Sequence, residues 1–338
     1  MKMKKIILIV SFCFLAFACK TKNEIEVTWD AKTNVDFLWQ TIDTKYCFLE
    51  EKKVDWNAIH NEYLSLAEDL DPSQRDYDEQ LFDLCAQMLN LLKDGHVNLY
   101  SWFDVSSYDG WYREAYPNFN LSLIFTKYVP SYRTASGLTY GYLSPEVTSQ
   151  SIGYIYYSSF NNSCASLAGV LSKLSDAKVL IIDVRNNGGG DLSNAYTLAA
   201  PFFTEDKQVG YWQHKNGPEH DAFSPLESLM VKADTKVQWR RPVYVLTNRR
   251  CFSATNFFVS CMTQADKVTL VGDTTGGGGG LPMSYEMPCG WTVRFSTVKM
   301  YDVHQHSIEQ GIAPAIRVDN TRSDVDDIIE KVIALTNN

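Results

Sequence analysis

The sequence predicts an α/β (α+β) protein in which a helical N-terminal domain precedes an α/β core. Between Trp29 and Leu92, apolar residues recur at steps of three and four, as they do in amphipathic helices. From residue 178 onward, short β-branched runs alternate with loops and helical patterns, which is typical of an α/β core. With 338 residues, the chain can hold one large or two modest domains.

The beginning of the chain differs in composition from the rest. Three lysines within the first five residues precede the apolar run 6–17, which ends at Ala18 and Cys19. A run of about 12 residues is too short to span a bilayer but suits a secretory signal. The segment resembles a bacterial lipoprotein signal, which implies that residues 1–18 are removed and that Cys19 carries a lipid. A plain signal peptide that is cut elsewhere is the alternative.

A lipidated Cys19 predicts a location in the cell envelope of a Gram-negative bacterium, periplasmic or at the surface. Residues 19–27 would then tether the protein to the lipid bilayer. Six cysteines remain after Cys13 and Cys19, and disulfides are permitted outside the cytoplasm. Cys85 and Cys261 lie inside apolar helical patterns, which favours buried free thiols there. The net charge of −9 argues against a nucleic-acid partner, which would require a basic face.

The helical domain is expected to cover residues 28–96, and the core residues 97–338. Asp71-Pro72-Ser73 interrupts the helical pattern, so three or four helices are expected. The apolar stripes of these helices are better explained as a hydrophobic core than as a cofactor site. Residues 97–160 change to short alternating stretches rich in Tyr, Ser, Thr and Val, which indicates strands and loops.

Two strand–loop–helix units stand out in the core. In the first, strand 178–184 is followed by a glycine loop, and Asp191 caps helix 192–203. In the second, strand 243–247 and loop 248–252 lead into helix 253–264. Catalytic groups in such cores gather at the carboxyl ends of the strands. The loops after both strands are therefore candidate positions for a functional site.

Ser253, at the start of the second of these helices, admits two interpretations. A serine in this position is usually an N-cap that accepts a hydrogen bond from a backbone N–H. The same position would place its hydroxyl beside the N–H of Ala254, where a helix start can stabilise an oxyanion. As a nucleophile, however, Ser253 would require a base.

Among the six histidines, His96 is the best-placed candidate for that base. It directly follows Gly95, which can take the left-handed conformation that ends a helix, so its position is well defined. His304 and His306 are expected to share one face of a strand, where a metal is conceivable. No third ligand stands at a recognisable spacing, so no metal is predicted.

Two glycine runs, 188–190 and 276–280, could expose bare backbone N–H groups. A phosphate-binding loop is the other interpretation, but neither run continues into the Gly-Lys-Ser/Thr pattern of nucleotide-binding loops. No cofactor is therefore predicted.

Five segments in a fixed order join these separate signals. Together they resemble the carboxyl-terminal processing (tail-specific) serine proteases, and they span roughly residues 90–320. The segments are Asp94-Gly95-His96, the run Leu180 to Gly190, Phe252-Ser253-Ala254, Val271 to Gly276, and Ile308 to Pro314. The resemblance implies a crotonase-like core and the hydrolysis of a polypeptide substrate.

The resemblance also implies roles for single residues. One branch of the family uses a Ser–Lys dyad, and the lysine position is Gly278 in this chain. The chain therefore resembles the other branch, which includes the tricorn core protease and the retinoid-binding protein repeats and uses serine, histidine and glutamate. The implied catalytic residues are Ser253, His96 and Glu309, with the oxyanion hole formed by N–H groups of Gly189 (or Gly188) and Ala254.

Several positions depart from the family pattern. Gly95 stands where tricorn-type enzymes often have a serine, and Thr255-Asn256 stands where many members have an acid. Ala315 replaces a common aspartate. Residues 97–150 are short for a PDZ module and lack its carboxylate-binding loop, so none is expected. The aromatic residues of this stretch could line a substrate cleft or form core; they are Tyr100, Trp102, Phe103, Trp111, Tyr112 and Tyr116.

The sequence thus predicts an exported serine endopeptidase that acts through an acyl-enzyme intermediate. The alternative is a catalytically inactive lipoprotein on the same fold that binds peptides or apolar ligands. A third interpretation places the nucleophile at Cys251, two residues before Ser253.

Overall fold

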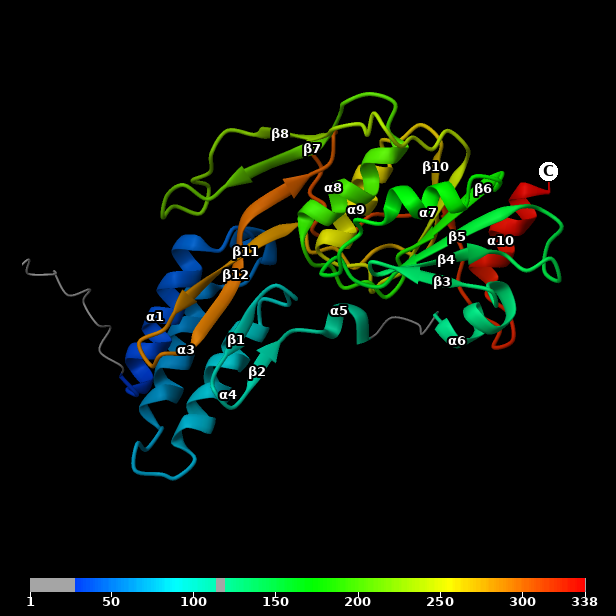
Figure 1. Ribbon diagram of the computed structural model, residues 1–338. Coiled ribbons are helices and arrows are strands. Elements are labelled where there is room, and N and C mark those ends of the chain that lie inside the picture. Colours follow the sequence, from blue (N-terminus) through cyan, green and yellow to red (C-terminus); the bar gives the residue numbers. More distant parts are fainter. Residues whose placement is uncertain (1–27, 114–118, 338) are drawn as a thin grey trace, which may run out of the picture.

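The computed structural model describes residues 28–113 and 119–337, and Figure 1 shows a helical half beside an α/β half. The helical half holds four helices. Two of them begin at aspartates whose side chains accept a backbone N–H of the first turn: Asp30 from Thr33 and Asp55 from Ala58. The helices are α1 (Ala31–Lys45), α2 (Leu49–Lys52), α3 (Trp56–Glu68) and α4 (Tyr77–Asn90).

The α/β half is built on a seven-stranded sheet in the order β13-β10-β9-β6-β5-β4-β3. Its central strands pair in parallel, and β3 and β4 join as an antiparallel edge. The strands are β3 (Arg133–Ala135), β4 (Leu138–Tyr142), β5 (Ile152–Tyr157), β6 (Val179–Asp183), β9 (Val243–Thr247), β10 (Val268–Gly272) and β13 (Ile316–Arg317).

Helices cover both faces of this sheet, as parallel sheets require. One hydrophobic cluster joins the sheet to α7 (Leu167–Lys173), α8 (Leu192–Ala199) and α9 (Ala254–Met262). A second cluster on the other face includes α10 (Asp327–Thr336). Short helical turns complete this half; they are α6 (Leu121–Leu123), the π-helix η1 (Ile124–Tyr128) and the 3₁₀ turn η2 (Ala200–Phe202).

A second sheet lies between the two halves and orders its strands β2-β1-β12-β7-β8, with β11 also paired to β12. The long strand β12 therefore connects segments that are far apart in sequence. The short helix α5 (Gly110–Arg113) follows β2. The strands are β1 (Asn98–Tyr100), β2 (Val105–Ser107), β7 (Lys207–His214), β8 (Glu227–Val231), β11 (Gly280–Glu286) and β12 (Thr292–Tyr301).

Most predicted elements are confirmed, although the stretch 97–160, expected to form strands and loops, also contains the helical segments α5, α6 and η1. The run from 29 to 92 forms helices that break around Asp71, and both strand–loop–helix units are present at β6–α8 and β9–α9. The expected strand at His304 and His306 is wrong. Both residues lie in a turn, where their backbone N–H groups donate to Asp302 Oδ1 at 2.8 Å. The aspartate satisfies that tight turn, so the backbone does not extend into a strand.

The predicted domain boundary after His96 remains a prediction, and the hydrophobic cores do not follow it. The core of the helical half includes Val97, Leu99 and buried residues between 287 and 295. The six cysteines 47, 85, 164, 251, 261 and 289 are buried and free, as predicted for Cys85 and Cys261. No helix among the described residues has the length and apolarity needed to cross a membrane. The predicted signal, tether and lipidated Cys19 lie outside the described residues.

Candidate active site

Ser253 directly precedes helix α9, at the carboxyl end of strand β9. Its backbone has φ 58° and ψ −122°, an unusual conformation for a residue with a side chain, and its side chain makes no capping hydrogen bond. The backbone N–H of Ser253 donates to Gly277 O at 2.9 Å, so the second glycine run helps to hold this conformation. A strained serine that does not cap its helix is a candidate for function.

His96 provides the contact that explains the serine. The Nε2 atom of its ring lies 2.9 Å from Ser253 Oγ, although 157 residues separate the two in sequence. The backbone N–H of His96 donates to Asp94 Oδ1 at 2.7 Å, and its ring packs against Phe252. Burial lowers the pKa of His96 to about 4, partly offset by the nearby Asp94 carboxylate. The imidazole is thus neutral at pH 7 and able to accept the serine proton.

The other ring nitrogen of His96 faces a residue that sequence reasoning missed. Ser296 Oγ, on strand β12, lies 3.4 Å from His96 Nδ1 and is fully buried. The neighbouring Gly280 leaves room for this hydroxyl, because a Cβ at Gly280 would lie only 2.4 Å from it. If Nε2 accepts from Ser253, Nδ1 carries the hydrogen and donates to Ser296. No motif marks this serine within its strand.

Glu309 lies beside the second glycine run. Its Oε2 accepts from the Gly279 N–H at 2.8 Å, and its backbone oxygen accepts from Gly278 N–H at 3.1 Å. Within residues 28–113 and 119–337, no hydrogen bond joins Glu309 to His96. The implied role of Glu309 in orienting that ring therefore remains a prediction. The observed contacts connect Glu309 to the loop that holds Ser253.

A buried group of charges lies behind these residues. Lys52 Nζ is 3.5 Å from Glu309 Oε1 and 3.8 Å from Asp94 Oδ2. The Tyr46 hydroxyl donates to Asp94 Oδ2 at 2.5 Å. Burial raises the pKa of Glu309 to about 8, the Asp94 charge adds to the rise, and Lys52 opposes it. Because Tyr46 and Lys52 belong to the helical half, both halves of the molecule build the site.

The predicted oxyanion-hole residues lie around Ser253. Gly189 is packed against it, since a Cβ at Gly189 would lie 2.8 Å from Ser253 Cβ. The Gly189 N–H, however, donates to Asn187 Oδ1 at 3.0 Å. No hydrogen-bond acceptor is found among the described residues for the N–H groups of Gly188 and Ala254. These two groups are therefore the available donors.

The aromatic stretch after His96 divides between the two expected roles. Trp111 stacks on Phe252 with ring centroids 4.3 Å apart, and Tyr112 lies under the Arg250 guanidinium. Both thus lie beside the segment that carries Ser253. Phe103 instead packs against the core of the helical half, and Tyr100 and Trp102 are exposed. Tyr116 lies outside the described residues.

The neighbouring cysteine is not poised for nucleophilic chemistry. Cys251 is fully buried, and its Sγ donates to Val184 O at 3.1 Å. Burial raises the pKa of its thiol to about 12, which keeps it protonated at neutral pH. These features weaken the third interpretation relative to that of Ser253.

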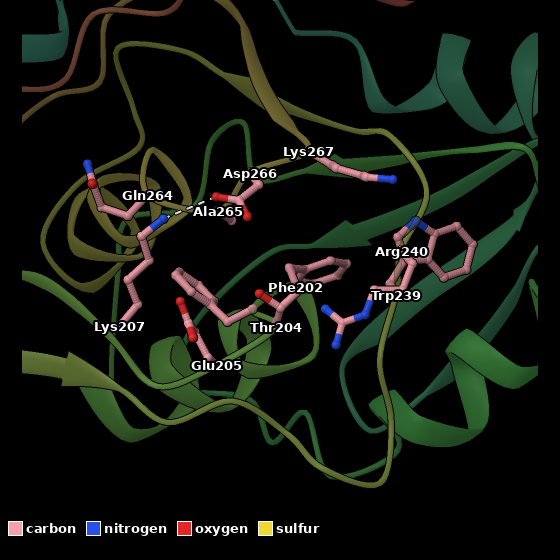
Figure 2. Close-up of a pocket in the computed structure, with 11 residues that line it drawn as sticks. Phe202, Thr204, Glu205, Lys207, Trp239, Arg240, Gln264, Ala265, Asp266 and Lys267 are labelled. Carbon is pink, nitrogen blue, oxygen red and sulfur yellow. Dashed lines mark hydrogen bonds and ion pairs between the residues drawn. The ribbon is translucent and has the colours of Figure 1, made fainter.

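A separate small cavity, about 70 Å³, lies near the opposite end of α9 (Figure 2). Figure 2 shows the Arg240 side chain reaching into it, with Lys207 paired to Asp266 at its rim. None of the candidate catalytic residues lines this cavity. Among the described residues, no group of three or more His, Cys, Asp or Glu side chains could hold a metal ion.

Comparison with known proteins adds a family to this geometry. The model of peptidase family S41 matches residues 151–318, and the model of the tricorn protease C1 domain matches residues 30–90. The carboxy-terminal processing protease CtpA of Bacillus subtilis is 27% identical over 178 residues. That alignment covers 52% of this chain and 36% of CtpA, so the chain matches about a third of its curated relative.

Two solved structures resemble the whole described fold. A crystal structure from Parabacteroides merdae, provisionally assigned as a peptidase, is 38% identical with a TM-score of 0.83, covering 90% of this chain and 96% of that one. Mature CPAF complexed with lactacystin has a TM-score of 0.66 at 13% identity, covering 91% and 98% of the two chains, and shows the shared fold alone. The chain belongs to peptidase family S41, the family of the carboxyl-terminal processing proteases, which are serine-type peptidases.

Proposed function

We propose that this protein hydrolyses peptide bonds with Ser253 as nucleophile and His96 as general base. The observation that carries the proposal is the 2.9 Å contact between Ser253 Oγ and His96 Nε2, at a serine whose backbone is strained and whose side chain does not cap its helix. A serine hydroxyl is a weak nucleophile at neutral pH unless a base takes its proton. The buried, neutral His96 fits that requirement.

The reaction proceeds in two steps, the formation of an acyl-enzyme and its hydrolysis. The Ser253 oxygen bonds to the carbonyl carbon while its proton passes to His96 Nε2. The proton then passes to the peptide nitrogen as the C–N bond breaks, which releases the amine and leaves an acyl-enzyme. In the second step, a water oxygen bonds to the acyl carbon while its proton passes to His96 Nε2. That proton then passes to Ser253 Oγ as the ester C–O bond breaks, which releases the acid. The N–H groups of Gly188 and Ala254 donate to the carbonyl oxygen while it carries negative charge.

Ser296 and Asp94 hold His96 in the orientation this chemistry needs. Ser296 accepts from the Nδ1–H, which fixes the tautomer whose Nε2 faces Ser253. Asp94 accepts from the His96 backbone N–H, and its charge favours the imidazolium that forms during the reaction. Glu309 acts on the other side of the site. It holds Gly278 and Gly279, next to the Gly277 carbonyl that accepts from Ser253 N–H.

Fluorophosphonate labelling tests the nucleophile without knowledge of the substrate. The purified protein should take up the label on Ser253, as mapped by mass spectrometry, and Ser253→Ala and His96→Ala should abolish it. Ser284→Ala, at an exposed position of β11, is the matched control and should label at the wild-type rate. A folded protein that takes no label would overturn the proposal.

The role of Ser296 has its own test in the pH profile of labelling. A hydrogen bond of about 1 kcal/mol corresponds to about a fivefold rate, so Ser296→Ala should slow labelling by roughly that factor. It should also move the acid limb, where His96 becomes protonated, to lower pH, because the imidazolium loses an acceptor. Ser296→Cys, which keeps a weak acceptor, should restore part of both. An unchanged pH profile in Ser296→Ala would assign the serine a packing role only.

A second candidate function is ligand binding without cleavage. Gly95 and Thr255-Asn256 depart from the pattern of the active family members, which favours it. Such a protein would bind peptides or apolar ligands yet leave Ser253 unlabelled. The labelling experiment therefore separates the two functions.

Export and lipidation of Cys19 form a separate part of the proposal, supported by the lysine-rich start and the apolar run 6–17. They place the protein in the envelope of a Gram-negative bacterium, periplasmic or at the surface. Metabolic labelling with an alkyne fatty acid should mark the wild-type protein and leave Cys19→Ser unmarked. Equal labelling of both would reject Cys19 as the lipid site.

A further inference from the structure

The hairpin formed by β1 and β2 leaves apolar side chains in solvent. Trp102 lies in the turn of the hairpin and is 79% exposed. Tyr100 and Val105, which pair across the two strands, are 36% and 58% exposed. An exposed tryptophan flanked by further exposed apolar residues is unusual on a soluble surface and commonly marks an interaction site.

A row of ring contacts, which passes through the buried Trp291, connects this hairpin to the segment before α1. Ring centroids are 5.0 Å apart between Trp102 and Phe103, 5.9 Å between Phe103 and Trp291, and 6.0 Å between Trp291 and Trp29. Trp29 is itself 38% exposed. We call Tyr100, Trp102, Val105 and Trp29 the aromatic patch. Figure 1 shows the hairpin and the start of α1 on the helical half, away from the C-terminal helix α10.

The chain that precedes the patch points to the occupant. The described residues begin at Thr28, and the predicted lipid-bearing Cys19 lies nine residues earlier. Trp29 follows Cys19 by ten residues, and ten extended residues span at most about 35 Å, so a lipid on Cys19 keeps Trp29 within that distance of the membrane surface. Tryptophan and tyrosine prefer the interface between headgroups and hydrocarbon, where an apolar ring and a polar N–H or O–H are both accommodated.

We propose that the aromatic patch seats the protein on the lipid bilayer, with Trp102 inserted at the headgroup level. The proposal rests on the lipidation of Cys19 and is independent of the peptidase chemistry. A membrane anchor becomes firm when a second signal adds to the lipid, and the patch supplies that signal. The hairpin segment 97–110 has no Lys or Arg, so the attraction is apolar rather than electrostatic.

The charges near the patch predict how membrane binding depends on lipid charge and on salt. Asp104 lies in the hairpin turn and Asp30 follows Trp29, so the patch carries no charge that would attract anionic headgroups. Binding through the patch should therefore not require anionic lipid, and purely zwitterionic vesicles should suffice. It should also persist when the ionic strength rises from about 0.1 M to 1 M, where a surface bound through basic residues would be released.

The test uses the purified lipidated full chain reconstituted into phosphatidylcholine vesicles with bromines at a shallow acyl position. Bromine quenches only nearby tryptophans, so the wild type should lose fluorescence relative to unbrominated vesicles. Trp102→Ser should remove most of that quenching, and Trp29→Ser a smaller part. Tyr132→Ser, at a 49% exposed position of the α/β half, is the control and should quench like the wild type.

A second measurement uses protein that carries no lipid anchor. The Cys19→Ser protein, exported through a non-lipid signal, should still sediment with phosphatidylcholine vesicles. Trp102→Ser should weaken that partitioning about tenfold, because burying a tryptophan ring removes a large apolar area from water.

Equal quenching and equal sedimentation with and without Trp102 would overturn the proposal. So would light scattering that shows a dimer dependent on Trp102, since the patch would then contact a second copy. Fluorophosphonate labelling in solution should stay unchanged in Trp102→Ser, so failure here leaves the catalytic proposal intact.

Discussion

Among the described residues, two buried groups each place one cation between two carboxyl groups, but at different distances. In the α/β half, Arg185 donates to Asp183 and to Asp326 with shortest distances of 2.6 and 2.8 Å, and all three side chains are fully buried. Behind the candidate active site, Lys52 stands 3.5 Å from Glu309 and 3.8 Å from Asp94. The first group is a tight network, whereas the second is a loose one.

The difference separates charges that hold the fold from charges that serve a site. A guanidinium with paired carboxylates forms directed hydrogen bonds that offset the cost of burial. Asp326 also caps α10 by accepting from Ile329 N–H, so the Arg185 network joins the end of β6 to the last helix. In the second group, two carboxylates share one lysine, and the pKa of Glu309 rises to about 8. Perturbed groups of this kind cluster at functional sites.

The largest effect should come from breaking the tight network. Arg185→Met leaves Asp183 and Asp326 buried without their cation, and we expect a loss of about 3–5 kcal/mol in the free energy of unfolding. Urea unfolding followed by circular dichroism measures it. The matched control is Arg317→Met, which removes a cation from a 62% exposed side chain paired with Asp273. Its loss should be below about 1 kcal/mol. Equal losses in the two variants would contradict the distinction drawn between the groups.

The sequence predicts well what depends on local pattern. The β-branched runs, the glycine loops and the helix starts locate β6, β9 and α9, and they place Ser253 at the carboxyl end of a strand. The sequence singles out His96 because Gly95 before it can end a helix, but that detail is wrong: α4 ends at Asn90, and Lys93 rather than Gly95 has the positive φ, 49°. The family resemblance supplies the partner of His96. The 2.9 Å contact between them is consistent with that inference.

The sequence predicts poorly what depends on contacts between distant elements. Ser296 lies in an alternating strand 200 residues from His96, and nothing in its neighbourhood distinguishes it from any inward-facing serine. Lys52 looks like an ordinary surface lysine at the end of a short helix, yet tertiary packing places it between the carboxyl groups of Asp94 and Glu309. The contacts of Glu309 with Gly278 and Gly279 are equally a product of tertiary packing.

A smaller effect should appear in the pH dependence of stability. Glu309 binds its proton more tightly in the folded state, with a pKa of about 8, than in the unfolded chain, where a glutamate titrates near 4.3. The folded state therefore holds an extra proton between these values, and stability falls as pH rises through them. His96 acts in the opposite direction between about 4 and 6.5, because burial lowers its folded pKa. The range from pH 6.5 to 8 thus reports Glu309 with least interference.

Glu309→Gln isolates this effect, because the amide cannot ionise and its oxygen can still accept from Gly279. Between pH 6.5 and 8 the wild type should lose on the order of 2 kcal/mol relative to the variant. Urea unfolding at several pH values measures the two slopes. If Glu309 instead orients His96 as the family resemblance implies, the same variant should slow fluorophosphonate labelling at least a hundredfold. If it holds the glycine loop, labelling should change only a few-fold.

The smallest effect should come from replacing Lys52, the cation of the loose group. We expect it to shift the pH range over which the ionisation of Glu309 lowers stability. Lys52 lowers the pKa of Glu309, so Lys52→Met should raise it and extend the fall in stability to pH values above 8. The shift is small because Lys52 Nζ lies 3.5 Å from Glu309 Oε1, which is longer than an ideal charged hydrogen bond. Lys52 also interacts with Asp94. The upper end of the unfolding-versus-pH curve measures it, with Lys32→Met as the control, since Lys32 pairs with Glu68 at the surface. A curve that keeps its wild-type upper limit in Lys52→Met would mean that burial alone sets the protonation of Glu309. The loose group would then be a by-product of packing rather than a device that tunes the site.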